Sequence, residues 1–181
     1  ALPASGDDGF DPLAELEPET DLVSAELLAD VETIAPGKSF TLGVRLRIKP
    51  KWHVYWINPG DAGLATEVEF NLPEGFEVGP LRWPTPIRFS QGGDDSGIVG
   101  YGYEGELLLT ATVRPPKALE PGQQVKLAAR VDWLSCKVQC IPGGADVSVQ
   151  LPVIEPDTRP ASANAKLFAQ WRSRLPAPAI S

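Results

Sequence analysis

The sequence contains no methionine, a single histidine and only two cysteines. These few residues cannot complete a closed zinc site, which needs four protein ligands, and the lack of methionine removes the thioether that favours Cu(I). Nothing in the sequence places the histidine, His53, beside a nucleophile and an orienting carboxylate, as triad chemistry requires. We therefore expect no metal site.

Basic residues and long apolar runs are scarce as well. Sixteen lysines and arginines face 24 acidic residues, for a net charge of −8. Nucleic acid and anionic lipid both require basic patches, so neither is an expected partner. No apolar run approaches the ~20 residues of a membrane helix, and no charged-then-apolar leader is present. The absence of methionine, even at position 1, favours a mature exported chain or an excised soluble part of a larger membrane protein.

Apolar and polar residues alternate along several segments, which predicts β-strands with one buried face. The pattern is clearest at 40–48 and recurs at 23–31, 52–57, 67–72, 107–113, 125–133 and 147–153. In the first of these, residues 25–28 would also tolerate a helix. Short strands, turn signals every ten or so residues and no intervening helices predict an all-β fold, an antiparallel two-sheet sandwich of immunoglobulin-like type.

The flanking segments have a different composition, which divides the chain into three parts. Residues 1–21 are rich in Gly, Asp, Glu and Pro, as in a flexible leader, and residues 22–155 are expected to form the domain. In 156–181, Ser162 can cap a short helix that Pro176 ends. Its apolar residues are Leu167, Phe168, Trp171 and Leu175. This helix either packs on the sandwich or begins a linker.

Cys136 and Cys140 follow the strand at 125–133. A tight turn over residues 137–139 would place them opposite each other at roughly 5.5 Å between Cα atoms, which suits a disulfide. A loop this short contributes little stabilisation, which favours a redox pair. The alternative is a binding or metal-handling module in which the hairpin disulfide is purely structural, with His53 as a conceivable third ligand. The simplest interpretation of His53 is a partly buried, hydrogen-bonded side chain.

An ordered series of motifs makes a resemblance specific. The motifs are WHVYWINPGDAG at 52–63, LPEGF at 72–76, LRWPTP at 81–86, YGYEG at 101–105 and WLSCKVQCIP at 133–142. Together they resemble the N-terminal periplasmic domain of DsbD-type thiol:disulfide interchange proteins, especially the ScsB-like branch. The resemblance covers roughly residues 22–155.

The resemblance implies a redox module in the bacterial periplasm that belongs to an inner-membrane protein. Such a module takes electrons from a thioredoxin-like C-terminal domain of the same protein and passes them to soluble periplasmic thioredoxin-fold partners. No cofactor takes part, and we expect the isolated domain to be monomeric. Cys136 and Cys140 match the redox cysteines of the family, and Cys140 matches the residue that forms the mixed disulfide.

The family also has a cap loop that covers the disulfide with an aromatic ring. By order along the chain this loop corresponds to part of 83–103, which the sequence predicts to be irregular through Gly100 and therefore functional or mobile. Phe89, Tyr101 and Tyr103 are the candidates for the capping ring.

Overall fold

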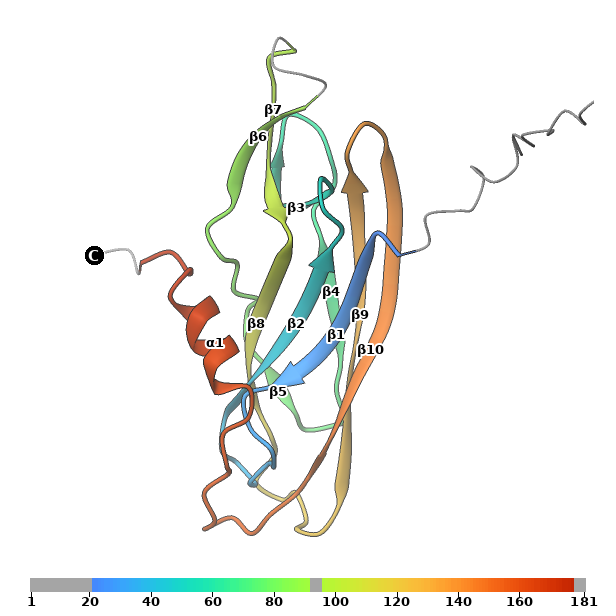
Figure 1. The fold of residues 1–181 in the computed structure, drawn as a ribbon. Coiled ribbons are helices and arrows are strands. Elements are labelled where there is room, and N and C mark those ends of the chain that lie inside the picture. Colours follow the sequence, from blue (N-terminus) through green and yellow to red (C-terminus); the bar gives the residue numbers. More distant parts are fainter. Residues whose placement is uncertain (1–20, 92–95, 178–181) are drawn as a thin grey trace, which may run out of the picture.

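The computed structural model describes residues 21–91 and 96–177, which form two facing antiparallel sheets and one helix (Figure 1). The strands are β1 (Val23–Ala29), β2 (Phe40–Ile48), β3 (His53–Gly60), β4 (Glu67–Asn71), β5 (Glu77–Val78), β6 (Ile87–Gln91), β7 (Ile98–Glu104), β8 (Glu106–Arg114), β9 (Gln124–Cys136) and β10 (Cys140–Pro152). One sheet has the order β1-β2-β8-β5. The other has the order β10-β9-β3-β7-β6, and β4 also pairs with β9. The expected immunoglobulin-like sandwich is confirmed.

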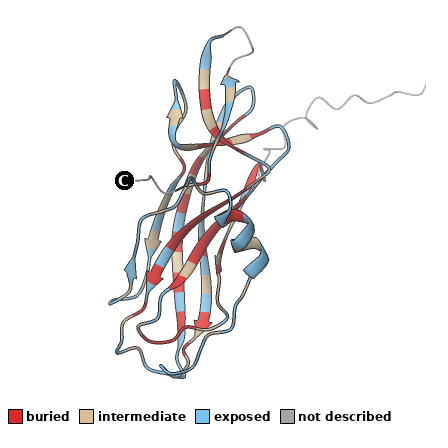
Figure 2. Cartoon of the chain, turned by 90° about the vertical axis from the view of Figure 1, so that its left-hand side faces the viewer, coloured by how far each residue is buried: buried red, intermediate tan, exposed pale blue. Residues whose placement is uncertain are grey.

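The core lies between the sheets, as the alternation of apolar residues predicts. On β2, Leu42, Val44 and Leu46 are fully buried, and Leu127 and Val131 of β9 are fully buried in the opposite sheet. Figure 2 shows buried segments on strands of the sandwich, interspersed with intermediate and exposed ones. Burial of each such side chain contributes roughly 1.5–3 kcal/mol. This packing gives the strands that carry the two cysteines a fixed position.

Helix α1 (Ala165–Arg172) packs on the sandwich, which decides between the two alternatives for this segment. Phe168 and Trp171 are buried. Gly43 of β2 makes room for the helix, because a Cβ atom there would lie only 3.0 Å from the Phe168 ring. Ser162 does not cap the helix. Asn164 occupies the cap position, where its backbone is left-handed and its side chain donates a hydrogen bond to the Ala29 carbonyl.

The stretch from Trp83 to Gly100 is not irregular, and this prediction was wrong. It contains β6 and the start of β7, which pair as an antiparallel hairpin with Phe89 opposite Gly100. The glycine-rich segment 92–97 suggested a long loop, but paired strands flank it on both sides. Residues 92–95 lie outside the described part of the chain. Residues 1–20 of the expected leader lie outside it as well. Among the described residues, no helix has the length and apolar character needed to cross a membrane.

Candidate functional site

The two cysteines form a disulfide across the end of the β9–β10 hairpin. Cys136 and Cys140 are paired in the register of the two strands, with 4.1 Å between their Cα atoms. This distance is shorter than the expected 5.5 Å and is near the ~4.5 Å between the Cα atoms of non-hydrogen-bonded antiparallel pairs. One position further from the turn, the Ser135 hydroxyl donates a hydrogen bond to the Ile141 carbonyl at 3.0 Å. The hairpin therefore holds both sulfur atoms in place.

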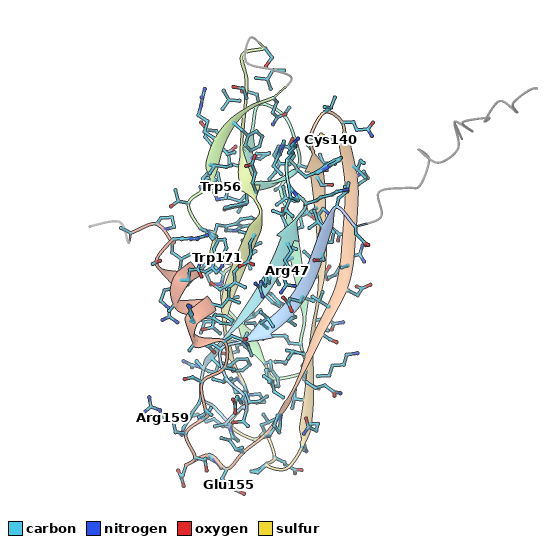
Figure 3. The ribbon with its side chains drawn as sticks, viewed as in Figure 1. Arg47, Trp56, Cys140, Glu155, Arg159 and Trp171 are labelled. Atoms are coloured by element: carbon cyan, nitrogen blue, oxygen red, sulfur yellow. A yellow bond between two sulfur atoms is a disulfide. The ribbon has the colours of Figure 1, made fainter. Side chains whose placement is uncertain are left out.

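The two sulfur-bearing residues differ in exposure. Cys136 is 3% exposed, whereas Cys140 is exposed and follows a three-residue turn whose Val138 is 96% exposed. Figure 3 shows Cys140 near one end of the sandwich, far from Glu155 and Arg159 at the other. A protein partner can therefore approach Cys140, while Cys136 is shielded.

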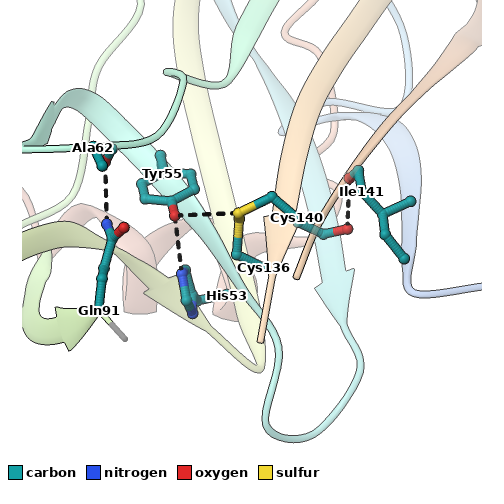
Figure 4. Close-up of a disulfide and its surroundings, with 8 residues drawn as sticks. His53, Tyr55, Ala62, Gln91, Cys136, Cys140 and Ile141 are labelled. Atoms are coloured by element: carbon teal, nitrogen blue, oxygen red, sulfur yellow. Dashed lines mark hydrogen bonds between the residues drawn. A yellow bond between two sulfur atoms is a disulfide. The ribbon is translucent and has the colours of Figure 1, made fainter. Parts of the chain in front are cut away.

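A tyrosine and a histidine of β3 lie beside the disulfide (Figure 4). His53 is opposite Cys136 in the sheet register. The Tyr55 hydroxyl lies 3.9 Å from Cys140 Sγ and 3.3 Å from His53 Nε2. Tyr55 was not among the residues that we expected at the site. The available signal was its spacing, because residues two apart on a strand share one face, and the face that carries His53 also carries Tyr55.

Burial determines the protonation states of this pair. It lowers the pKa of His53 below its ordinary value, because the charged imidazolium is poorly solvated there. It raises the pKa of the Tyr55 hydroxyl for the same reason. At neutral pH the site thus contains a neutral imidazole and a protonated phenol.

The loop after β3 fixes the position of Tyr55 and of the neighbouring β6–β7 hairpin. Gly63 has a φ of 111° and lies against the Tyr55 ring, where a Cβ atom would come within 2.4 Å of Cε1. The Val99 amide donates to the Asp61 carboxylate at 2.8 Å, and the Gln91 side-chain amide donates to the Ala62 carbonyl at 3.0 Å. The NPGDAG motif therefore connects the disulfide environment to β6 and β7.

The three candidates for the capping ring lie in different places. The Phe89 ring is 4.1 Å from the His53 ring and 6.0 Å from the Tyr55 ring, measured between centroids. Tyr101 packs against Trp56 at 6.4 Å. Tyr103 is buried in the core and donates a hydrogen bond to the Pro84 carbonyl at 2.7 Å. Of the three, Phe89 contacts the side chains that surround the disulfide.

Two kinds of group could change the chemistry of the sulfur atoms: a nearby carboxylate, which opposes thiolate formation, and a cluster of metal ligands. Asp132, a possible opponent of thiolate formation, is engaged by Arg130 at 2.7 Å. Within residues 21–91 and 96–177, no three His, Cys, Asp or Glu side chains are grouped so that they could hold a metal ion. The chemistry that the geometry supports directly is that of the disulfide itself.

Comparisons with solved structures show a similar fold. The N-terminal periplasmic domain of ScsB from Proteus mirabilis is 19% identical, with a TM-score of 0.59; the match covers 88% of this chain and 56% of that one. This chain therefore spans little more than half the length of the ScsB domain. The reduced form of the Neisseria meningitidis DsbD N-terminal domain is 15% identical, with a TM-score of 0.39, and the match covers 85% of this chain and 100% of that one. No curated protein matches the chain.

A sequence family matches far more of the chain than the cysteine hairpin alone. The family is described as the N-terminal part of the thiol:disulfide interchange protein DsbD, and it matches residues 19–152. The matched range contains every strand of the sandwich, together with the disulfide, His53 and Tyr55. The chain thus belongs to the family of DsbD N-terminal domains.

Proposed function

We propose that this domain transfers electrons in the bacterial periplasm by thiol–disulfide exchange through Cys136 and Cys140. The observation that carries the proposal is the disulfide between an exposed Cys140 and a buried Cys136, in a chain of the DsbD N-terminal family. An exchange reaction requires a cysteine that a partner can approach, and the exposure of Cys140 meets this requirement, whereas a structural bridge does not need it. Residues 22–155 form the redox unit in this proposal, and 156–181 are an attachment to it.

The exchange proceeds through a mixed disulfide. A thiolate of the electron donor attacks Cys140 Sγ, and Cys136 leaves as a thiolate. The second thiol of the donor then attacks the donor sulfur that is bonded to Cys140. Cys140 leaves, and this domain is released as a dithiol. In the next round Cys140 attacks the disulfide of an acceptor, and Cys136 resolves the complex. Each of the two exchange reactions transfers two electrons, first from the donor to this domain and then from this domain to the acceptor. No cofactor is required.

The partners follow from the family and not from contacts in the structure. The donor in this proposal is a thioredoxin-like C-terminal domain of the same inner-membrane protein, and the acceptor is a soluble periplasmic thioredoxin-fold protein. The domain acts as a monomer. Its exposed turn, with Lys137, Val138 and Gln139, offers a protruding surface next to Cys140 that a partner can contact.

The reduction potential of the disulfide tests this function against a purely structural bridge. Equilibration with glutathione or dithiothreitol redox buffers, followed by alkylation and mass measurement, gives the fraction reduced at each potential. We expect a midpoint above about −300 mV, because structural disulfides of secreted proteins lie below that value. A midpoint below it would show that the bridge is structural and that the domain is a binding module.

A further inference from the structure

We propose that Tyr55 and His53 remove the proton from the Cys140 thiol, with Tyr55 in contact with the sulfur and His53 as the proton acceptor behind it. The inference rests on the proposed function, because a thiol needs to ionise only if it acts as a nucleophile. It assigns a role to two side chains that the exchange reaction described above does not use.

The geometry places the three groups in a row. Cys140 Sγ lies 3.9 Å from the Tyr55 hydroxyl, within the range of a hydrogen bond to sulfur, and that hydroxyl lies 3.3 Å from His53 Nε2. A hydroxyl donates one hydrogen bond and accepts others, so Tyr55 can take a proton on one side while it releases one on the other. Gly63 presses against the Tyr55 ring, which is 1% exposed, and keeps the row aligned.

The surroundings keep His53 able to accept a proton. Opposite His53 stand Glu104 on β7 and Cys136 on β9, while β6 places the Phe89 ring against it. The charged residues at these positions or next to them are Glu104 of β7, Arg88 of β6 and Lys137 of the β9–β10 turn; all three are exposed, so water screens their fields. Burial lowers the pKa of His53, and the imidazole is therefore neutral at pH 7 and has a lone pair available.

The proton and electron movements balance. In the reduced domain the Cys140 thiol donates to the Tyr55 oxygen, and the Tyr55 hydroxyl donates to His53 Nε2. As Cys140 Sγ forms a bond to the acceptor's sulfur, its proton passes to Tyr55 and the Tyr55 proton passes to His53. The acceptor's own S–S bond breaks, its electron pair stays on the departing sulfur, and that thiolate takes up a proton from His53 or from water. The Cys136 thiol then loses its proton to water and attacks Cys140 Sγ; the mixed disulfide breaks, its electron pair stays on the acceptor's sulfur, and that thiolate takes up a proton, so the acceptor leaves as a dithiol.

The test is the pH profile of alkylation at Cys140. In the Cys136→Ser variant Cys140 is the single thiol, and its rate of reaction with iodoacetamide rises with the thiolate fraction and with any base that takes the thiol proton during the attack. At pH 7 we expect His53→Gln and Tyr55→Phe each to lower this rate about five- to tenfold and to move the midpoint toward the ~8.5 of a free thiol. The double variant should lose no more than either single variant, because both act in one chain. The difference in alkylation rate should disappear below the pKa of His53, where the imidazole is already protonated. It should also disappear above pH 9, where the thiol is mostly ionised in every variant.

Matched variants separate proton transfer from positioning. Glutamine can still hydrogen-bond to Tyr55 but cannot accept the proton, so a profile that His53→Gln leaves unchanged would overturn the proposal. Tyr101→Phe removes a hydroxyl from a tyrosine that packs on Trp56, and it should have no effect; an equal shift there would also overturn it. The assay contains no protein partner, so its failure leaves electron transfer through Cys140 intact. A reduction potential of the disulfide below about −300 mV would instead contradict the proposed function.

Discussion

Replacement of Cys140 by serine is expected to reduce the exchange rate with a thioredoxin-fold disulfide by about three orders of magnitude or more, as loss of a nucleophile does elsewhere. Cys140 is the exposed partner of the pair, and the buried Cys136 cannot reach another protein. The rate is measured as oxidation of the prereduced domain by a disulfide-bonded thioredoxin-fold protein, followed by alkylation of the remaining thiols.

Cys136→Ser is the matched control. It keeps the exposed nucleophile and loses only the resolving thiol, so it should react once and remain attached to the partner. Both variants should stay folded, because a loop this small contributes only roughly 2 kcal/mol of chain-entropy stabilisation. Circular dichroism and thermal melts check this point. Equal exchange rates for the two serine variants would contradict the assignment of Cys140, and loss of the fold would favour a structural bridge.

Phe89→Ala is expected to accelerate reduction of the disulfide by glutathione about tenfold, because loss of ring contacts worth roughly 1–1.5 kcal/mol changes an opening equilibrium by that factor. The Phe89 ring packs on His53 and is near Tyr55, the two side chains that line the sulfur atoms. We propose that it shields the disulfide from small thiols and that a docking protein replaces its contacts. The measurement is the pseudo-first-order rate of thiol appearance at fixed glutathione concentration.

Tyr101→Ala is the control for this prediction. Tyr101 lies on the neighbouring strand and packs on Trp56, so its removal should leave the glutathione rate unchanged. Tyr103→Phe is a second control, because it removes only the hydroxyl that donates to the Pro84 carbonyl and avoids a cavity in the core. An unchanged rate in Phe89→Ala, or the same acceleration in Tyr101→Ala, would show that Phe89 does not cap the disulfide.

The sandwich could be predicted from the sequence because its strands carry long, regular alternation. The run at 40–48 shows this most clearly, and it became β2 with every second residue in the core. The hairpin of β6 and β7 was not predicted, because its strands lack this regular alternation. Its strand β6 is a five-residue edge strand without a buried residue, next to a glycine-rich connection, and its partner β7 contains Gly100 and Gly102, so neither strand shows a clear apolar alternation.

The site was predictable in its cysteines but not in its surroundings. A separation of four positions and a three-residue turn suffice to place Cys136 opposite Cys140. The contact between Tyr55 and Cys140 joins residues 85 positions apart and depends on the order of β3, β9 and β10 in the sheet. The contact between the Phe89 and His53 rings, on which the proposed cap rests, depends on which face of the β6–β7 hairpin meets His53. Both results require the assembled sheet.

The most direct test of electron transfer through Cys140 is mass spectrometry of a trapped mixed disulfide. The oxidised wild-type domain is mixed with a reduced thioredoxin-like protein that lacks its resolving cysteine, and the complex is alkylated and digested without reductant. The account predicts a disulfide-linked peptide pair that contains Cys140, with Cys136 alkylated as a free thiol. A partner joined to Cys136, or no covalent complex at all, would contradict it.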